Sequence, residues 1–402
     1  MKLIVLGAGG MGSYAAKTAA TFDYVDDLLV ADLDAGAAER LASACGPRAR
    51  GGRVDVADAA GLEELLSGAD VVLNTVGPFF RFGPPVLTAA IRAGCHYLDI
   101  NDDWESTEAM FAQHEEARSR GITALIGMGA SPGMSNLLAV TAARELDSVE
   151  ELYAGFDLDA AMPETKGDTP AAATVHGVHQ LTGKIRVFDD GTLRDERAMR
   201  RIELDYPGLG RLPSWTMGHP EAISLPKQFP SLRRSVAVMT MDHTNIFAMR
   251  ILGNLIGLKL VSVERAAGWV EVLEGVGKPV KAPADYLEEI SAADSTRLPP
   301  LFALAKGKKD GKTASVAAAI LSAPAVGMGG ATGVPLALGL DVLRPDGECK
   351  RGVYAPESVI EPDRFFDRIA PLCAPAKTDR QDMLLVSRSW ESRDLRSELR
   401  PR

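Results

Sequence analysis

Cysteine is scarce in this chain of 402 residues, which contains only four. The four are Cys45, Cys95, Cys349 and Cys373, which lie far apart and show no CxxC spacing. Disulfide-stabilised small proteins and structural zinc sites both need cysteines paired at short spacings. The pattern argues against both classes and predicts reduced thiols, so we expect a cytoplasmic protein without a metal site.

Basic charge is also in short supply. The chain has 44 lysine and arginine residues against 54 aspartate and glutamate residues, which gives a formal net charge of -10. A surface that binds nucleic acid needs clustered positive charge to neutralise phosphates. We therefore expect no nucleic-acid partner.

Long apolar runs are missing as well. A membrane-spanning helix requires roughly 18 uninterrupted apolar residues, and no stretch reaches that length. Residues 314–328 come nearest, but this segment is too short and contains serine and proline. We expect no membrane span.

The first 130 residues show short aliphatic runs that alternate with amphipathic segments. Strands are expected at Leu3–Leu6, Leu28–Ala31, Val71–Asn74, Tyr97–Ile100 and Thr123–Ile126. Runs that are apolar throughout suit strands covered on both faces, and helical crossovers join parallel strands. The pattern predicts an α/β domain over residues 1–130 with a doubly wound parallel sheet.

A glycine-rich turn directly follows the first expected strand and opens a helix of small residues, Ser13–Ala20. It reads Gly7, Ala8, Gly9, Gly10, Met11, Gly12. Gly7 permits a tight turn, Gly9 lets a pyrophosphate approach the backbone, and Gly12 allows close packing of the helix. Strand, turn and helix in this order predict a Rossmann dinucleotide-binding domain, with the phosphates at the helix N-terminus.

Asp32 stands 20 residues after Gly12, at the end of the second expected strand. A carboxylate here accepts hydrogen bonds from the adenosine ribose and repels a 2′-phosphate, and Arg40 lies two helical turns away. NAD is therefore expected rather than NADP, although Asp32 as a simple helix cap is the alternative. Asp55, after the third strand, is expected near the adenine edge or, equally, in a solvated loop.

The segment after the fourth expected strand, residues 74–83, is expected to be a loop at the carboxyl edge of the sheet, where ligands of such folds bind. The alternative is that its phenylalanines only cover the sheet. We expect Phe80 and the nearby Asn101 on the substrate side. The residues expected to contact the cofactor are Asn74, Val76, Gly77, Pro78 and Phe79.

A second turn-to-helix junction runs from Ala130 to Asn136. Its backbone N–H groups can hold a carboxamide or a substrate carboxylate at the positive end of a helix, or the turn is merely a helix cap. The substrate-binding candidates here are Ser131, Pro132, Gly133 and Asn136.

Residues 131–328 show a different pattern, which predicts an α+β domain. A helix is expected from Ser135 to Glu145, and the best hairpin is expected at Leu301–Leu321 around an Asp310-Gly311 turn. Residues 275–300 are expected to form a helix within loops, and residues 387–402 a solvated tail. Alternating segments that favour an antiparallel sheet are Glu151–Asp157, Lys184–Phe188, Ser235–Met241 and Leu258–Arg265.

Six short motifs occur in an order that resembles the saccharopine dehydrogenase family, and within it the lysine 6-dehydrogenase type. They read GAGGMG, VGPFFRFG, HYLDI, GASPGMSN, FPSLRR and KRGVYAPE. The resemblance implies a Rossmann domain, an α/β domain for substrate and dimerisation in a homodimer, and a C-terminal segment, residues 329–402, that returns to the Rossmann side. One departure is Asn101-Asp102-Asp103, which replaces a glycine-rich turn of the lysine-specific relatives.

By the same resemblance, the reaction is hydride exchange at a carbon that carries nitrogen. Such an oxidation needs a base to remove a proton from the amine. Asp103 and His219 are the favoured candidates, with Asp102 and Glu221 as further ones, and for each the alternative is a solvated or capping residue.

The histidines His176 and His179 are three positions apart, the spacing of a metal pair on a helix. No third ligand is identifiable and hydride transfer to NAD needs no metal, so we interpret them as polar pocket or surface residues. His179 is kept as a substrate-binding candidate.

Three functions compete. The leading one is an NAD-dependent oxidoreductase acting on an amino acid or a related amine or imine, similar to lysine 6-dehydrogenase or saccharopine reductase. The second is an enzyme that keeps NAD bound and recycles it in deamination, cyclisation or aminoalkyl transfer. The third is a dinucleotide-sensing or scaffold protein without chemistry.

Overall fold

A computed structural model describes residues 1–159, 172–274, 288–292, 296–324, 327–344, 349–373 and 377–399. The chain forms two compact units. The first unit consists of Met1–Met134 and Met328–Glu361, and the second of Ser135–Gly327 and Pro362–Arg402.

The first unit contains a parallel sheet with the strand order β15-β6-β5-β4-β1-β2-β3. Its strands are β1 (Lys2–Leu6), β2 (Asp27–Asp32), β3 (Ala49–Arg53), β4 (Val71–Asn74), β5 (His96–Asp99), β6 (Thr123–Leu125) and β15 (Gly352–Tyr354). Every residue of β4 is buried, as expected for a strand covered on both faces. The sequence prediction of a doubly wound parallel sheet is confirmed.

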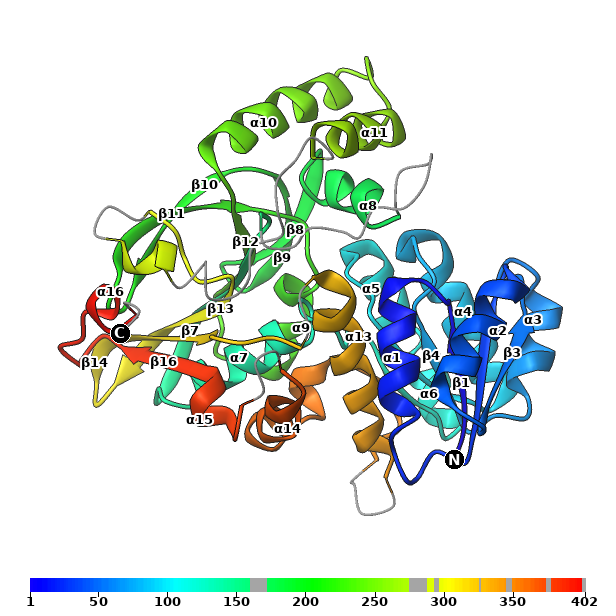
Figure 1. Cartoon of the computed structure of the whole chain (residues 1–402). Coiled ribbons are helices and arrows are strands. Elements are labelled where there is room, and N and C mark those ends of the chain that lie inside the picture. The colour runs from blue at the N-terminus through cyan, green and yellow to red at the C-terminus, as the bar shows by residue number, and fades with distance from the viewer. Residues whose placement is uncertain are drawn as a thin grey trace. The chain divides into compact units, whose positions relative to one another are not determined.

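Helices cover both faces of this sheet. They are α1 (Gly10–Ala19), α2 (Ala35–Cys45), α3 (Ala59–Leu66), α4 (Phe79–Ala93), α5 (Trp104–Phe111), α6 (His114–Ser119) and α13 (Met328–Leu338), with 3-10 turns at Gly339–Leu343 and Pro356–Ser358. α13 lies directly beside α1 (Figure 1). A Cβ atom on Gly333 would stand 2.3 Å from the Met11 carbonyl oxygen, so the two helices meet backbone to backbone.

The expected loop at residues 74–83 is shorter than predicted, because α4 already begins at Phe79. The prolines Pro84 and Pro85 disfavour a helix in the sequence. The buried side chains of Phe79, Val86 and Leu87 nevertheless anchor this helix to the sheet. Packing therefore overrides the local propensity.

The second unit contains a sheet with the strand order β10-β11-β12-β7-β13-β14-β16, with β8 paired to β12 and to β9. Its strands are β7 (Ser148–Asp157), β8 (Lys184–Asp189), β9 (Thr192–Arg197), β10 (Arg201–Tyr206), β11 (Gly210–Thr216), β12 (Arg234–Thr240), β13 (Leu301–Lys309), β14 (Lys312–Ile320) and β16 (Leu384–Arg388). β7 and β12 pair in parallel, and the other pairs are antiparallel. The prediction of a mostly antiparallel second sheet is confirmed.

Helices accompany this sheet and are spread along the sequence of the second unit. They are α7 (Met134–Ala143), α8 (Ala172–Gln180), α9 (Glu221–Gln228), α10 (His243–Gly257), α11 (Val263–Glu274), α14 (Pro362–Ile369), α15 (Arg380–Met383) and α16 (Leu395–Glu398), with a 3-10 turn at Ala370–Leu372. Residues 275–287 and 293–295, within the segment expected to form a helix in loops, lie outside the described residues.

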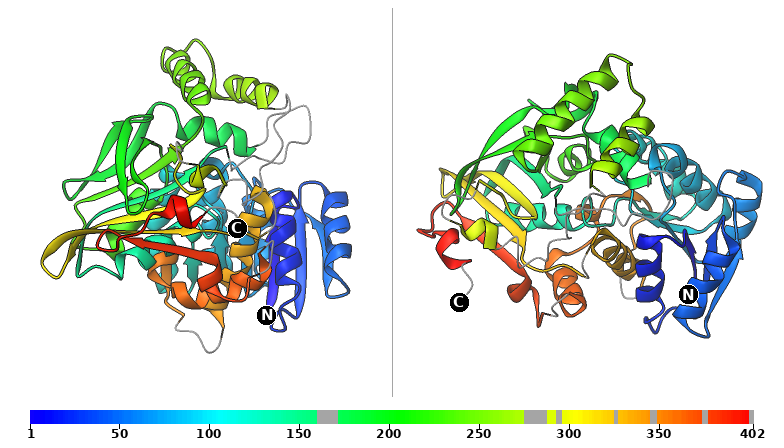
Figure 2. Two further views of the ribbon diagram at one scale, coloured as in Figure 1. Left: turned by 60° about the vertical axis from the view of Figure 1, so that its left-hand side comes forward. Right: turned by 45° about the horizontal axis from the view of Figure 1, so that its top comes forward.

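The hairpin of β13 and β14, yellow in Figure 2, has the turn that the sequence predicts. Asp310 and Gly311 adopt positive φ angles of 50° and 73°. Two central residues with positive φ make a primed turn, whose twist matches that of the strands, and Asp-Gly is a favoured pair for it.

Three predictions that concern the second unit are wrong in whole or in part. Leu258–Arg265 forms no strand: its first residues connect α10 to α11, with Lys259 at a φ of 59°, and residues 263–265 already belong to the first turn of α11. The expected return of residues 329–402 to the Rossmann side stops at Glu361. Residues 384–388 pair with β14, and Leu395 is fully buried, so the tail is not a solvated end.

No helix among the described residues is both long enough and apolar enough to cross a membrane.

Candidate functional site

The glycine turn has the geometry of a phosphate cradle. Gly7 has a φ of +99°, and its N–H donates to the Ala31 carbonyl oxygen at 2.9 Å. A Cβ atom on Gly12 would stand 2.0 Å from the Gly7 carbonyl oxygen, whereas a Cβ on Gly9 would meet nothing within 4 Å. Gly12 is therefore needed to close the turn, and Gly9 leaves the open backbone that a pyrophosphate needs. Gly10 and Met11 open α1.

Asp32 holds this turn to the end of β2. Its Oδ2 accepts a hydrogen bond from the Ala8 N–H at 2.7 Å, and its Oδ1 accepts one from the Asp34 N–H at 2.9 Å. The cap of α2 is Asp34, which accepts from Gly36 and Ala37. The alternative reading of Asp32 as the helix cap is therefore wrong.

Two arginines stand near this end of the second strand. Arg53 is in register with Asp32 on the neighbouring strand and is exposed, and sequence reasoning missed it. Arg40 lies 3.8 Å from the Asp34 carboxylate. Asp55 is exposed, and its Oδ1 accepts a hydrogen bond from the Ala57 N–H at 2.9 Å.

A buried polar network occupies the carboxyl ends of β4 and β5. The Asn74 Nδ2 donates to the Tyr97 hydroxyl at 3.0 Å, and that hydroxyl donates to Asp99 Oδ2 at 2.8 Å. Asp99 Oδ1 accepts from the N–H groups of Gly127 at 2.7 Å and Asn101 at 3.0 Å. Burial raises the pKa of Asp99 to about 6, against the effect of these hydrogen bonds.

Sequence reasoning placed Asp99 among the carboxylates at this edge of the sheet but proposed neither Tyr97 nor Asp99 as a site residue. The signal was present in the HYLDI motif, because residues two apart on a strand project from the same face. Of the loop residues after β4, Val76 donates its N–H to Asn74 Oδ1 at 3.0 Å. Gly77 and Pro78 lead into α4, where Phe79 is buried and Phe80 is 44% exposed.

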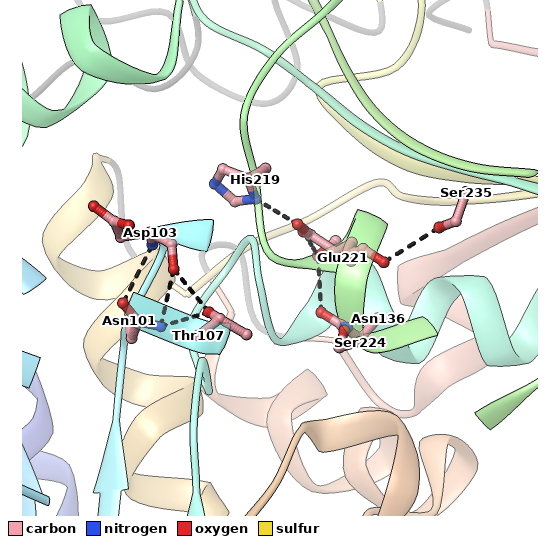
Figure 3. Close-up of polar contacts among 9 residues, drawn as sticks. Asn101, Asp103, Thr107, Asn136, His219, Glu221, Ser224 and Ser235 are labelled. Atoms are coloured by element: carbon pink, nitrogen blue, oxygen red, sulfur yellow. Dashed lines mark hydrogen bonds and ion pairs between the residues drawn. The ribbon is translucent and has the colours of Figure 1, made fainter. Parts of the chain in front are cut away.

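The Asn101-Asp102-Asp103 turn is held by its own side chains, as Figure 3 shows. Asp103 caps α5, and its Oδ1 accepts from the N–H groups of Glu105 and Ser106. Asn101 donates to the Thr107 hydroxyl at 2.7 Å and accepts from the Asp103 N–H at 3.2 Å. This geometry matches the capping alternative for Asp103, while Asp102 is half-buried and its charge adds to the raised pKa of Asp99.

The second turn, residues 129–133, closes on itself. The Gly129 N–H donates to the Pro132 carbonyl oxygen at 2.8 Å, and the Met134 N–H donates to the Gly129 carbonyl oxygen at 3.0 Å. The Met134 N–H, one of the donors of Ala130–Asn136 that we expected to be open to a ligand, is therefore used within the turn. Gly133 has a φ of +120°, and Ser131 is half-buried.

The second unit contains a buried cluster around Glu221. His219 Nδ1 is hydrogen-bonded to Glu221 Oε2 (Figure 3). The Ser135 hydroxyl donates to Oε1 of the same carboxylate at 2.6 Å. His219 and Glu221 are each only 1% exposed. The His219 ring packs against Phe156, with 5.5 Å between the ring centroids.

Neighbouring hydrogen bonds fix the segment that carries these side chains. Residues 217–220 connect β11 to α9, and the Met217 N–H donates to the Ala237 carbonyl oxygen at 3.0 Å. The Ser235 hydroxyl donates to the Glu221 carbonyl oxygen at 3.2 Å, and Asn136 Nδ2 donates to the Ser224 hydroxyl at 3.1 Å. These hydrogen bonds therefore fix the backbone around the Glu221 carboxylate and the His219 imidazole.

The sequence-predicted catalytic residues fall into two groups. Asp102 and Asp103 belong to the first unit, whereas His219 and Glu221 belong to the second, where they contact each other. Ser135 was missed, although it precedes the predicted Asn136. His179 is half-buried on α8, and the side chain of His176 lies outside the described residues. Within the part of the chain that the structure describes, no group of three or more His, Cys, Asp or Glu residues could hold a metal.

Comparisons with known proteins agree with this architecture. Residues 3–125 match the family model of the saccharopine dehydrogenase NADP binding domain. The chain is 26% identical over 397 residues to a carboxyaminopropylagmatine dehydrogenase from Synechocystis, an alignment that covers 93% of this chain and 96% of the relative. It is 24% identical over 275 residues to a carboxynorspermidine synthase from Vibrio cholerae, which covers 58% of this chain and 61% of that one.

Two solved structures share the fold. Apo saccharopine dehydrogenase (L-Glu forming) from Saccharomyces cerevisiae superposes with a TM-score of 0.57 at 16% identity and covers 96% of this chain and 99% of its own. The homospermidine synthase of Legionella pneumophila in complex with NAD gives a TM-score of 0.55 at 13% identity, covering 97% and 92%. Together with the phosphate cradle, these matches identify residues 3–125 as an NAD(P)-binding domain of the saccharopine dehydrogenase type, and the chain shares the fold of the two solved structures over most of its length.

Proposed function

We propose that the enzyme uses NAD to oxidise a C–N bond in an amino acid or a related amine, or to reduce the matching imine. The buried cluster of Ser135, His219 and Glu221 carries this proposal, because it can exchange a proton with nitrogen or water. The names of two relatives, a carboxyaminopropylagmatine dehydrogenase and a carboxynorspermidine synthase, support a substrate that bears both amine nitrogen and a carboxyl group.

In the oxidation, the carbon next to nitrogen loses two electrons as a hydride and the nitrogen loses a proton, which leaves a C=N bond. The nicotinamide cofactor, when bound, supplies the hydride acceptor. A protein base must take the proton. Water then adds to the C=N bond and releases a carbonyl compound and an amine.

His219 is the base in this proposal. An ionised Glu221 accepts the Nδ1 proton of the imidazole, which leaves a lone pair on Nε2 for the substrate proton. Glu221 orients the ring and stabilises the imidazolium that forms, as a carboxylate does in other histidine-based sites. The Ser135 hydroxyl donates to the other oxygen and so favours the ionised carboxylate.

Burial strengthens this arrangement. Both side chains are almost fully excluded from water, so the attraction between carboxylate and imidazolium is screened much less than at a surface. Phe156 restricts the ring from one side. Asp103, the other favoured base, uses one carboxylate oxygen to cap α5. His219 is therefore the stronger candidate for the base.

NAD is preferred over NADP in this proposal because of Asp32. Its carboxylate stands at the end of β2, where the ribose of a bound dinucleotide would lie, and there it would disfavour a phosphate on the 2′ oxygen. The same placement of the dinucleotide at the carboxyl edge of the sheet supports the cofactor contacts that we expect of Gly7, Gly9, Gly12 and the loop after β4.

The test is a screen of amino acids, diamines and pairs of an oxo acid with an amine, read as absorbance at 340 nm in both directions with NAD and with NADP. We expect a stoichiometric change in NADH with one amine-containing substrate. An enzyme that recycles bound NAD would convert substrate without net NADH, and a scaffold protein would convert nothing.

Lysine and saccharopine belong in this screen, because the motifs of the chain resemble those of the lysine 6-dehydrogenase type. The expected homodimer and cytoplasmic location stay predictions, and light scattering on the purified protein tests the first of them.

A further inference from the structure

A buried carboxylate, that of Asp99, stands where three loops of the first unit meet. Asp99 ends β5, which lies between β4 and β6 in the parallel sheet. Its side chain is fully buried. The carboxyl ends of all three strands lie at the same edge of the sheet, so the loops that follow them converge around this residue.

The register of the strands explains why the network forms. Asn74 on β4 pairs with Asp99, and Val72 pairs with Tyr97. Residues in register on parallel strands project from the same face, and residues two apart on one strand do so as well. Asn74, Tyr97 and Asp99 therefore lie on one face of the sheet, where the Tyr97 hydroxyl is hydrogen-bonded to both of the other side chains.

Each of the three loops is connected to Asp99 by a hydrogen bond or a short chain of them. The loop after β6 donates through the Gly127 N–H, and the loop after β5 donates through the Asn101 N–H. The loop after β4 is reached through Tyr97 and Asn74, because Asn74 Oδ1 accepts from the Val76 N–H at 3.0 Å. Every group that contacts the Asp99 carboxylate in this network is a donor.

We propose that Asp99 is a positioning residue for the nicotinamide end of the cofactor, and that its ionised carboxylate sets the shape of the three loops that form this part of the binding site. The proposal rests on the proposed placement of the cofactor at the carboxyl edge of the sheet. It goes beyond the proposed chemistry, because it concerns cofactor affinity and not the reacting carbon.

Protonation of Asp99 would change this arrangement. A carboxylate oxygen that carries a proton becomes a donor, and the donors around it then lose an acceptor. Asp99 has a pKa near 6 because of its burial, so this change takes place between pH 7 and pH 5. The ionisable groups that face it are Tyr97, on the same strand, and Asp102, in the following loop.

The experiment measures the dissociation constant of NAD by calorimetry from pH 5 to pH 8, for the full-length wild type and for Asp99→Asn, without substrate. The wild-type constant should rise about tenfold as the pH falls through 6, which corresponds to the loss of one hydrogen bond to a charged group. In Asp99→Asn the constant should be raised about tenfold at pH 8 and should not change with pH.

Two controls separate positioning from stability. Asp58→Asn alters a carboxylate that caps α3 in the same unit, and it should leave the dissociation constant and its pH dependence as in the wild type. Tyr97→Phe removes one donor and keeps the carboxylate, so it should weaken NAD binding less than Asp99→Asn and should retain the pH dependence.

A wild-type dissociation constant that is the same at pH 5 and pH 8 would overturn the proposal, even if Asp99→Asn did not fold. The proposal would also fail if folded Asp99→Asn bound NAD as tightly as the wild type. Because no substrate is present, failure of the proposed C–N chemistry would show in the turnover screen and not in this measurement.

Discussion

Two buried carboxylates, Asp99 in the first unit and Glu221 in the second, differ in what holds them. Backbone N–H groups and a tyrosine hydroxyl contact Asp99. A serine hydroxyl and an imidazole contact Glu221. Backbone donors cannot give up their protons, whereas an imidazole can. The same functional group therefore fixes loops in one place and supports proton transfer in the other.

The largest expected effect is that of His219→Asn. Removal of the imidazole should lower kcat about a thousandfold, within the range of general-base effects, and should leave the dissociation constant of NAD unchanged. Steady-state kinetics with the substrate found in the screen, together with calorimetry, measure both quantities. Turnover at the wild-type rate by a folded variant would remove His219 from the reaction.

Glu221→Gln should have the next largest effect, because the amide cannot stabilise an imidazolium as a carboxylate does. We expect kcat to fall about a hundredfold. The matched variant Ser135→Ala removes only the hydrogen bond to the other oxygen and should lower kcat about tenfold. Equal losses in the two variants would contradict the assignment of separate roles.

Asp32→Ser should change cofactor choice and leave the chemistry intact. Without the negative charge, the ratio of NADP to NAD dissociation constants should shrink about tenfold. Titration of both cofactors measures this ratio, and Asp55→Ser provides a control carboxylate from the neighbouring loop. Tighter binding of NADP by the wild type would show that Arg53 or Arg40 outweighs Asp32.

The smallest effect is expected from Asp103→Ala. Loss of the α5 cap should lower the free energy of unfolding by about 1 kcal/mol, with turnover unchanged. Asn is also a good cap, so Asp103→Asn should restore the stability measured by urea denaturation. If instead kcat fell a hundredfold in both variants, Asp103 and not His219 would be the base.

Much of the first unit was predictable because its signals are local. An apolar run, a glycine turn and a helix of small residues follow one another within the first 20 residues, and each has a single favourable arrangement. The Asp310-Gly311 hairpin is local in the same sense. The residues 258–265 misled the prediction because apolar alternation over a few positions also occurs where two helices join.

The candidate site was predictable only in part. His219 and Glu221 are two residues apart, and the sequence marks both as candidates, but their partner Ser135 lies 86 residues away. The sequence likewise places Asp103 after a strand, where a base or a cap is equally reasonable. Only the two hydrogen bonds from the start of α5 show that one of its oxygens caps the helix.

The sequence by itself determined the dinucleotide-binding turn, the parallel sheet that presents it and the acidic residue at the end of the second strand. These depend on backbone sterics and on side-chain periodicity, which act over neighbouring residues. The tertiary structure alone decided which carboxylates are buried and what contacts them, as well as where the C-terminal strand pairs. Burial and long-range hydrogen bonds arise only when distant segments pack, and no local pattern encodes them.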